Sequence, residues 1–378
     1  MPTISIRGNE MPASPIRKLA PLADAAKQRG VHVFHLNIGQ PDLPTPQAAI
    51  DAIRNIDRKV LEYSPSAGYR SYREKLVGYY AKFNINLTAD DIIITSGGSE
   101  AVLFSFLSCL NPGDEIIVPE PAYANYMAFA ISAGAKIRTI ATTIEEGFSL
   151  PKVEKFEELI NERTKAILIC NPNNPTSSAI STADMKKLLT VCRSLGIFVM
   201  IDETYIEFAP EGTSLSAVSL VPEFDNFMVI RGVSKFFAAP GLRFGYGLTS
   251  NQAFLQTLLT HQNPWGLNSV GAYAGERMLK DTDYIKKTWT LIDSERTRMC
   301  KELSELDTVK IYPAYANFVL VRILKEGLTS FDVFEKAIHQ NFMIRDCSSF
   351  ESLNGEYVRF CIMNPEDNDR LLDVFRSL

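Results

Sequence analysis

The sequence has scattered cysteines, few histidines and no block of basic residues. None of its six cysteines stands within three residues of another, and the chain has only four histidines. This spacing excludes a CxxC motif and argues against a disulfide framework or a zinc site, so we expect no metal. Lysine and arginine total 39 against 44 aspartates and glutamates, a net charge of −5, and no run of five basic residues occurs. The charge therefore argues against nucleic acid as a partner.

The chain also lacks a long apolar stretch. Its longest apolar run, Ala101–Leu110, stops at Asn-Pro-Gly-Asp and is far too short to span a bilayer. The first 20 residues are broken by prolines and contain no apolar segment of the secretory type. We therefore expect a cytoplasmic protein with no membrane partner.

The sequence does contain a regular alternation of short apolar runs and helix-length segments. With 378 residues, 46% of them apolar and 22% charged, it has the composition of a globular protein with room for two to three domains. Continuous apolar strands alternating with helices predict an α/β fold, in which helices cover both faces of a mostly parallel sheet. The predicted strands are 92–95, 115–118, 165–170, 198–201, 227–230 and 244–248, with a helix over 182–195.

The last hundred residues follow a different order and predict a smaller α+β domain. The proline-rich start has no strand pattern before 31–36 and is expected to cross both units. We therefore predict a large domain over 45–268 and a small domain formed by 1–44 and 269–378. The predicted elements of the last part are a helix of about thirty residues (268–306), strands 317–323, 342–345 and 357–362, a helix over 330–340, and a final helix with Asn364 as N-cap and Pro365 at its first position.

Two predicted strands are followed by segments that could bind an anion. In open α/β sheets, ligands bind beyond the carboxyl ends of the strands. Ser96-Gly-Gly-Ser-Glu100 follows the strand 92–95 and opens a helix, where free N–H groups suit a phosphate. It is neither GxGxxG nor GxxxxGK[ST], and alone it is also compatible with a tight turn. Asn171-Pro-Asn-Asn-Pro-Thr176 follows the strand 165–170 and alone reads as an extended polar turn.

Ionisable residues follow the next strands. Asp202 ends the strand 198–201, where a buried acid needs a cationic partner, although helix capping is an alternative role. Lys235 precedes two phenylalanines, so we expect a partly desolvated ammonium with a lowered pKa, whereas most lysines are simply solvated. Arg243 opens one strand and Arg359 lies in another, and a buried arginine needs an anion.

Together these groups match the needs of pyridoxal 5'-phosphate. Its phosphate needs a helix N-terminus and an arginine, its pyridine nitrogen an acid, its phenolic oxygen hydrogen-bond donors, and its aldehyde an amine. The strand ends supply each of these groups in turn along the chain. The sequence therefore predicts a site for this cofactor.

The sequence resembles class I/II aminotransferases, which belong to fold type I of the pyridoxal-phosphate enzymes, over nearly its whole length. The resemblance implies a large cofactor-binding domain with a smaller α+β domain. It also implies transfer of an amino group between an α-amino acid and a 2-oxo acid by a ping-pong mechanism. The motifs that carry it are Leu36-Asn-Ile-Gly-Gln-Pro-Asp42, Tyr63-Ser-Pro-Ser-Ala-Gly68, Glu120-Pro-Ala-Tyr123, Asn174-Pro-Thr176, Asp202-x-x-Tyr205, Ser234-Lys235 and Arg243-Phe-Gly-Tyr246.

The resemblance implies a role for each residue around the cofactor ring. Lys235 holds the cofactor as a Schiff base and then moves a proton between substrate and cofactor as general base and acid. Asp202 pairs with the pyridine nitrogen, while Tyr205 and Asn174 bind the phenolic oxygen. Tyr123 stacks on the ring.

The resemblance also implies how the phosphate and the substrate are held. Arg359 binds the substrate carboxylate through two parallel hydrogen bonds, and Gly39 lets the backbone approach that carboxylate. Tyr63 reaches the phosphate of the neighbouring subunit, which implies a homodimer. The remaining phosphate contacts are implied for Gly98, Ser99, Glu100, Ser234 and Arg243.

Two departures from the family's motifs stand near these residues. The usual Asn-Pro-Thr-Gly ends in Ser177 here. If the backbone at this position needs a positive φ, serine adopts it less readily than glycine unless the loop rearranges. The usual Ser-x-Ser-Lys begins with Gly232, which removes one hydroxyl from the phosphate site. Neither change removes a reacting group, so we expect an active enzyme.

The C-terminal part leaves the substrate open. Ala316–Val321 and Ile344-Arg-Asp-Cys347 are more similar to histidinol-phosphate aminotransferases and threonine-phosphate decarboxylases. In those relatives, an arginine at the place of Arg345 helps to hold a phosphorylated substrate, whereas the alternative role of Arg345 is a surface ion pair with Asp346 or a neighbour. Transamination is the first hypothesis. The second hypothesis is decarboxylation or β-elimination, with phosphorylated amino acids among the candidate substrates. A sensor without turnover is the third, although no segment resembles the DNA-binding region such proteins carry.

Overall fold

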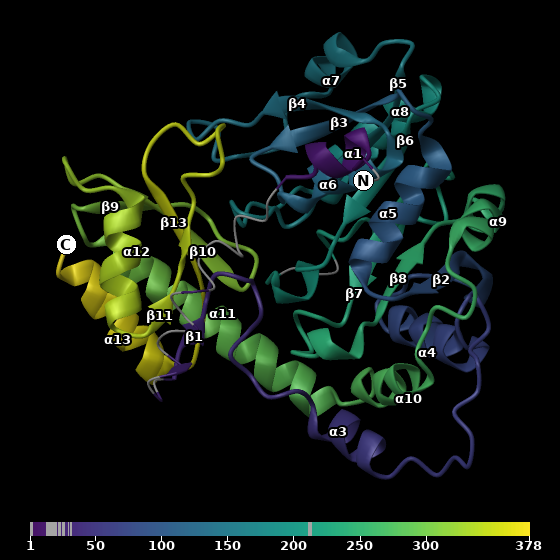
Figure 1. The fold of residues 1–378 in the computed structure, drawn as a ribbon, viewed down its shortest axis with the longest axis horizontal. Helices are drawn as coiled ribbons and strands as arrows, with labels where there is room; N and C mark the ends of the chain where they lie inside the picture. The colour runs from purple at the N-terminus through teal and green to yellow at the C-terminus, as the bar shows by residue number, and fades with distance from the viewer. Residues whose placement is uncertain are drawn as a thin grey trace.

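The computed structural model describes residues 3–12, 21, 24, 27–28, 30, 32–210 and 214–378. Its main feature is a seven-stranded sheet in the order β2-β8-β7-β6-β5-β3-β4 (Figure 1). β8 is antiparallel to both of its neighbours, and the other neighbouring pairs are parallel. The strands are β2 (Ile92–Thr95), β3 (Glu115–Glu120), β4 (Lys136–Ala141), β5 (Thr164–Cys170), β6 (Phe198–Asp202), β7 (Phe227–Gly232) and β8 (Gly245–Leu248).

Helices cover this sheet on both faces because its strands are apolar on both sides. Successive side chains of a strand point to opposite faces. Ile93 accordingly packs in one core cluster with helices α5, α6 and α9, whereas Ile92 and Ile94 pack in a second cluster with α4 and α8. This confirms the predicted α/β fold with a mostly parallel sheet. The helices beside the sheet are α3 (Gln47–Arg54), α4 (Arg70–Ala81), α5 (Gly98–Cys109), α6 (Asn125–Ala133), α7 (Val153–Leu159), α8 (Thr182–Ser194), α9 (Gln252–His261) and α10 (Ser269–Met278), with short 3-10 turns at Ala89–Asp91, Ile206–Phe208, Ala217–Leu220 and Pro240–Leu242.

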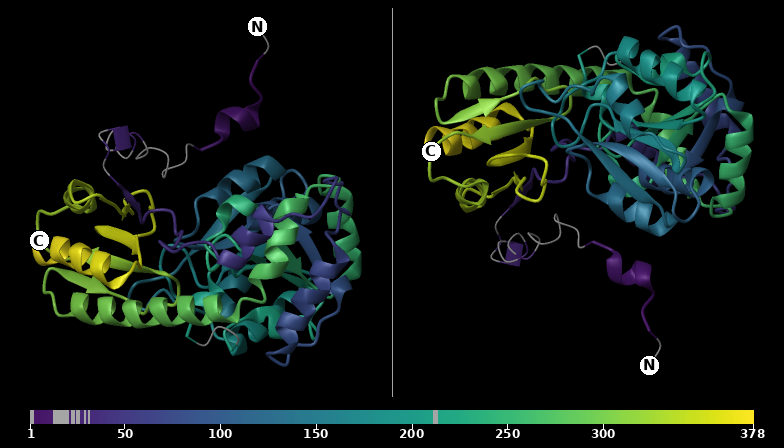
Figure 2. Two further views of the ribbon diagram at one scale, coloured as in Figure 1. Left: turned by 90° about the horizontal axis from the view of Figure 1, so that it is seen from below. Right: turned by 90° about the horizontal axis from the view of Figure 1, so that it is seen from above.

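The C-terminal residues form a second, antiparallel sheet in the order β12-β13-β10-β9. The N-terminal segment joins this part, because β1 (Phe34–His35) pairs with β11 (Phe342–Met343). The long helix α11 (Thr282–Ser304) runs along the outside of both parts (Figure 2). The other elements are α1 (Ile6–Glu10), β9 (Val309–Ile311), β10 (Phe318–Ile323), α12 (Ser330–His339), β12 (Arg345–Asp346), β13 (Tyr357–Cys361) and α13 (Pro365–Arg376).

The single thirty-residue helix predicted over 268–306 is wrong. Two helices, α10 and α11, occupy this stretch, and the break lies at residues 279–281. Asp281 causes it, since its side chain accepts the backbone N–H of Tyr284 at 3.0 Å and so begins a new helix. The final helix begins with Asn364 as N-cap and Pro365 as first residue, as predicted.

The N-terminal segment crosses from the small sheet to the large one between residues 34 and 45. After β1, Thr45 donates a hydrogen bond to the carbonyl of Ala238 at 2.6 Å. Residue 31, where the sequence predicts the first strand to begin, lies outside the described residues. The domain boundaries at 44/45 and 268/269 remain a prediction. Among the described residues, no helix is both long and apolar enough to cross a membrane.

Candidate active site

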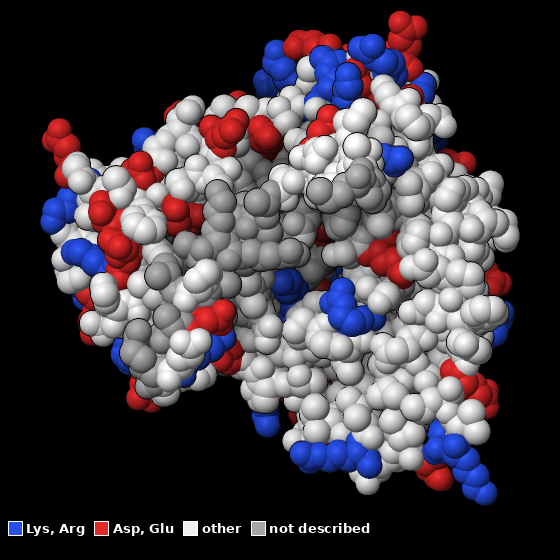
Figure 3. Space-filling model, viewed as in Figure 1, with Lys and Arg blue, Asp and Glu red and all other residues white. Residues whose placement is uncertain are grey.

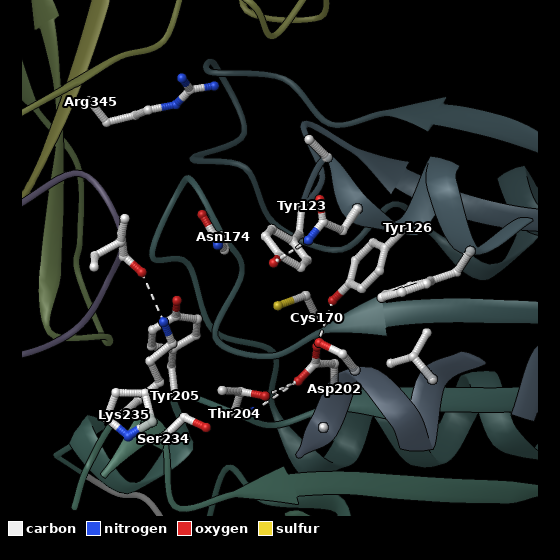
Figure 4. A pocket seen from close by; sticks show the side chains of 18 of the residues that line it. Tyr123, Tyr126, Cys170, Asn174, Asp202, Thr204, Tyr205, Ser234, Lys235 and Arg345 are labelled. Atoms are coloured by element: carbon white, nitrogen blue, oxygen red, sulfur yellow. Dashed lines mark hydrogen bonds between the residues drawn. The ribbon is translucent and has the colours of Figure 1, made fainter. Parts of the chain in front are cut away.

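A cavity of about 330 Å³ lies at the carboxyl edge of the large sheet, facing the small sheet. The space-filling view shows a hollow in the middle of this face with basic side chains inside it (Figure 3). The cavity collects side chains from both sheets and from the loops after β5, β6 and β7 (Figure 4). Among the predicted site residues, it is lined by Gly98, Ser99, Tyr123, Asn174, Asp202, Tyr205, Ser234, Lys235, Arg243, Arg345 and Arg359.

The N-terminus of α5 forms one end of the cavity and is suited to bind an anion. Its first N–H groups have no partner within the helix, and the helix dipole favours negative charge there. Arg243 lies against this end, with Nη2 3.4 Å from the carbonyl of Ser96. Gly97 makes this approach possible: its φ is +88°, and a Cβ there would come within 2.5 Å of the Arg243 guanidinium. β8 runs antiparallel, so Arg243, two residues before it, lies at the same edge as the ends of the parallel strands.

Asp202 is held at the floor of the cavity by two hydroxyl groups. Tyr126 donates its hydroxyl to Oδ2 at 2.8 Å. The hydroxyl and the backbone N–H of Thr204 both donate to Oδ1, the latter at 3.0 Å (Figure 4). Burial keeps the pKa of Tyr126 well above its usual value, so this hydroxyl stays a donor. These bonds fix the orientation of the carboxylate.

Lys235 lies opposite Asp202 and has a weakly basic amine. Its Nζ donates to the carbonyl of Ile38 at 2.8 Å and has no carboxylate within ion-pair distance among the described residues. Burial, followed by the influence of nearby arginines, lowers its pKa from 10.5 to about 8, although Cys361 and Asp202 oppose this change. The sequence predicted a lowered pKa. At pH 7 roughly a tenth of the amine is therefore neutral and nucleophilic, far more than for a lysine of ordinary pKa.

Arg359 and Asn174 lie together on the small-sheet side of the cavity. Arg359 donates to the side-chain carbonyl of Asn174 and to the backbone carbonyl of Asn37. Its guanidinium lies 4.8 Å from the ring centroid of Phe318, and it is only 3% exposed. Its Nε is buried and has no hydrogen-bond partner.

Arg345 lines the same side, and its proposed surface ion pair with Asp346 is wrong. The residue is 4% exposed and donates to the hydroxyl of Ser349 at 2.6 Å. Asp346 instead accepts from Ser330 and Ser348. Arg345 lies on β12, a two-residue edge strand of the small sheet, opposite Arg359 of β13, and its buried side chain lines the cavity. Burial lowers the pKa of Arg345, and Arg359 adds to that effect.

Two tyrosines border the space between these groups. Tyr205 is buried, and burial keeps its pKa far above the usual value, so it remains a hydrogen-bond donor. Gly39 lies against it with φ +74°, and a Cβ there would come within 2.4 Å of the Tyr205 hydroxyl. The hydroxyl of Tyr123 accepts a hydrogen bond from Asn125 at 2.7 Å.

Three predicted site residues do not line the cavity. Gly39 lies against Tyr205, which lines the cavity, and the carbonyl of Gly39 accepts a hydrogen bond from Asn317 at 3.1 Å. Glu100 turns away and accepts the backbone N–H of Ser96 at 2.6 Å. Tyr63 is 80% exposed, with its ring centroid 4.9 Å from that of Trp265.

The two departures from the family's motifs have different structural consequences. Ser177 adopts φ +64°, the backbone conformation expected of the usual glycine, and it is fully buried. A non-glycine residue in this conformation costs roughly 1–2 kcal/mol. Gly232 lies at the end of β7, where a Cβ would be 3.4 Å from the carbonyl of Phe244 and 3.8 Å from the backbone nitrogen of Gly98. These are ordinary van der Waals distances, so the backbone leaves room for a Cβ at this position.

The sequence reasoning missed Tyr126 and Thr204, which fix Asp202. Each stood near a recognised motif: Tyr126 is three residues beyond Tyr123, and Thr204 is two beyond Asp202. The bond from Thr204 is local, whereas the hydroxyl of Tyr126 reaches Asp202 across 76 residues of sequence. Cys170 and Asn125 also line the cavity and were not predicted to do so.

The charge of the cavity shows what it can hold. Lys235, Arg243, Arg345 and Arg359 line it, and within the described ranges none of them has an ion pair with a carboxylate. Of the described residues that line the cavity, Asp202 is the one with an acidic side chain. Arg345 and Arg359 are buried, whereas Arg243 is exposed, so the expectation of a buried arginine at 243 is wrong. Buried cations need anions, so the cavity fits carboxylate-like groups near the small sheet, and the N-terminus of α5 beside Arg243 suits a phosphate. Together with the amine of Lys235 and the acid Asp202, it fits pyridoxal 5'-phosphate.

The comparisons agree with this geometry. The pattern of the family described as "Aminotransferase class I and II" matches residues 31–375. A histidinol-phosphate aminotransferase of Methanopyrus kandleri is 29% identical over 89% of this chain and 85% of its own length. A threonine-phosphate decarboxylase of Salmonella typhimurium is 28% identical over 91% of this chain and 90% of its own. The crystal structure of an aspartate aminotransferase of Thermotoga maritima has the same fold, with a TM-score of 0.88 and 24% identity over 99% of both chains.

The protein belongs to the class I and II aminotransferase family. It is an enzyme of that family, and its cofactor is pyridoxal 5'-phosphate.

Proposed function

We propose that the protein transfers an amino group between an α-amino acid and a 2-oxo acid by a ping-pong mechanism, and that its substrate carries a second anionic group. The observation that supports this is a cross-strand pair. Arg345 and Arg359 are directly opposite in the β12–β13 register, both are buried, and both line the cavity. Like charges opposite each other on neighbouring strands are destabilising unless an anion separates them. One arginine suits the α-carboxylate and the other a phosphate.

The residues around the cavity have distinct tasks in this reaction. Bound pyridoxal phosphate supplies the electron sink for the bond broken at the substrate Cα. Lys235 binds the cofactor and, once released, takes the proton from Cα as general base and returns one as general acid. Asp202, held by Tyr126 and Thr204, keeps the pyridine nitrogen protonated.

Other residues hold the reactants in place. Tyr205 and Asn174 bind the phenolic oxygen and Tyr123 stacks on the ring. Arg359 orients the substrate carboxylate through paired hydrogen bonds. The phosphate contacts proposed are Gly98, Ser99, Ser234 and Arg243, with Tyr63 from a second subunit; Glu100 is left out because its carboxylate accepts the N–H of Ser96 instead.

The test is a substrate panel with purified protein and pyridoxal phosphate. Single amino acids, threonine phosphate and histidinol phosphate are added, and the cofactor absorbance is followed before and after a 2-oxo acid. We expect a reversible change in the absorbance band with a phosphorylated compound and a much weaker one with its unphosphorylated counterpart. No change with any compound, or equal responses to both members of each pair, would contradict the proposal.

Two arginine variants sharpen the test. Arg345→Gln should raise KM for the phosphorylated substrate about 10- to 100-fold, because hydrogen bonds to a charged group contribute about 1.5–3 kcal/mol. Its matched control is Arg322→Gln in the same sheet, since the Arg322 guanidinium lies 5.8 Å from the Tyr357 ring and does not line the cavity. Equal effects of the two variants would refute a substrate contact by Arg345.

Decarboxylation is the second candidate, since one of the similar proteins is a threonine-phosphate decarboxylase. The same cofactor serves both reactions, and which bond breaks depends on how the substrate is held against the ring. Release of carbon dioxide from threonine phosphate, with no amino group passed to a 2-oxo acid, would favour this reaction over transamination.

We also propose a cytoplasmic homodimer in which Tyr63 crosses to the neighbouring site. The exposed rings of Tyr63 and Trp265 lie together, and Val60 and Leu61 are exposed nearby in the chain. Sedimentation should give a dimer, and Tyr63→Ala should weaken cofactor binding. A monomer with full cofactor affinity would contradict this arrangement.

A further inference from the structure

Ser177 stands where the family's motif has glycine, and its hydroxyl joins the two parts of the molecule. It accepts the backbone N–H of Ala316 at 2.8 Å and that of Tyr315 at 3.1 Å. The carbonyl of Ser177 also accepts from Tyr315 at 2.9 Å. A glycine could form only the last of these bonds. The strained backbone of Ser177 is thus accompanied by contacts that the usual residue cannot make.

On one side, this bridge begins in the loop that carries Asn174. The backbone N–H of Ser177 donates to the carbonyl of Asn173 at 2.8 Å, and Asn173 donates to the carbonyl of Ser178 at 2.8 Å. These bonds close the loop into a compact turn, so that a displacement of Ser177 also displaces Asn174.

On the other side, the bridge ends at the entry to β10. The carbonyl of Ala316 accepts from Arg296 of α11 at 3.0 Å, and Asn317 donates to the carbonyl of Gly39 at 3.1 Å. β10 then pairs with β13 so that Leu320 faces Arg359. The position of Arg359 relative to Asn174, to which it donates a hydrogen bond, therefore depends on residues 315–316.

We propose that Ser177 is a positioning residue: its hydroxyl fixes the strand that carries Arg359 against the loop that carries Asn174, and so sets the substrate carboxylate site. The proposal rests on the proposed function for the role of Arg359. Ala316 is fully buried, so its N–H has no water to replace the lost acceptor when the hydroxyl is removed.

Two substitutions at this position separate the bridge from the strain. Ser177→Ala removes the hydroxyl and keeps the unfavourable backbone conformation, whereas Ser177→Gly removes both. Ser178→Ala is the matched control, because the neighbouring hydroxyl bonds to Thr176 within the same loop and not to residues 315–316. Ser177→Gly restores the family's own residue, so it tests the hydroxyl in a backbone that tolerates the change.

Amide hydrogen exchange and steady-state kinetics provide the readouts, with the protein loaded with pyridoxal phosphate. In both Ser177 variants, the amide of Ala316 loses its acceptor and should exchange about tenfold faster, whereas that of Tyr315 keeps the carbonyl of Ser177. KM for the amino donor should rise about five- to tenfold with little change in kcat. Ser178→Ala should resemble the wild type in both. Ser177→Gly should melt at a higher temperature than Ser177→Ala.

Two other outcomes would overturn the proposal. Unchanged exchange in Ser177→Gly would show that the hydroxyl bonds do not hold residues 315–316. Faster exchange with an unchanged KM would show a structural bridge that does not position Arg359. If the wild-type protein does not transaminate, the proposed function is refuted instead. The exchange data would then still show whether the Ser177 hydroxyl holds residues 315–316.

Discussion

The hydrogen bond from Tyr126 to Asp202 offers a quantitative test of the cofactor site. Tyr126→Phe removes one hydroxyl from a side chain that is 2% exposed and keeps its ring in the core. The lost bond, 2.8 Å long, ends on a buried carboxylate, and such bonds contribute about 1.5–3 kcal/mol. Water cannot readily replace the donor. Since each 1.4 kcal/mol is a factor of ten, we expect pyridoxal phosphate to bind roughly 10- to 150-fold more weakly.

The assay is a titration of cofactor-free protein with pyridoxal phosphate, followed by the absorbance of the bound cofactor. Tyr123→Phe is the matched control, because it removes a hydroxyl from a neighbouring tyrosine whose partner is Asn125. Its ring remains in the cavity, so the loss of affinity should be far smaller. An unchanged affinity in Tyr126→Phe, or equal losses in both variants, would refute the view that the hydroxyl of Tyr126 holds Asp202 in place for the cofactor.

Three further outcomes follow from the structure. The rate at which cofactor-free protein captures pyridoxal phosphate should fall about tenfold for each pH unit below 8, because the pKa of Lys235 is about 8 and only the neutral amine reacts. Stopped-flow absorbance measures this rate. A midpoint of the pH–rate curve near 10.5 would contradict the lowering of this pKa by burial. Arg359→Lys should raise KM for the amino donor about 10- to 100-fold, since an ammonium cannot form the paired hydrogen bonds, and an unchanged KM would place the carboxylate elsewhere. Asp281→Ala should lower the free energy of unfolding by about 1 kcal/mol in urea without changing KM, because it removes only the N-cap of α11.

The fold and most of the lining of the cavity could be predicted from the sequence because both depend on local order. Apolar runs identify buried strands, and parallel strands bring the residues that follow them to one edge. Asp202 and Lys235 are close in space for this reason alone. Arg243 arrives from the opposite strand direction, so its place depends on β8 being antiparallel.

What could not be predicted depends on how elements far apart in the sequence pack. For Arg345 the sequence left a substrate contact and a surface ion pair open, because its burial depends on how β12 packs beside β13 at the cavity. Tyr126 faces Asp202 across 76 residues of sequence, and periodicity carries no information about that contact. The break at Asp281 was missed because helical patterns on both sides of an N-cap can be read as one helix.

The place of β2 in the sheet has a consequence for the synthesis of the chain. β2 is the first strand of the large sheet to be made, yet it lies at the edge and pairs only with β8 among the described strands. Ile92 faces Leu248, so 248 − 92 = 156 residues separate the partners. Until β8 leaves the ribosome, the isoleucines of β2 have no partner strand, and closing so long a loop is entropically costly and slow. The N-terminus of α5 and Arg243 come together only in that last step, so a nascent chain acquires its anion site when its sheet closes and not before.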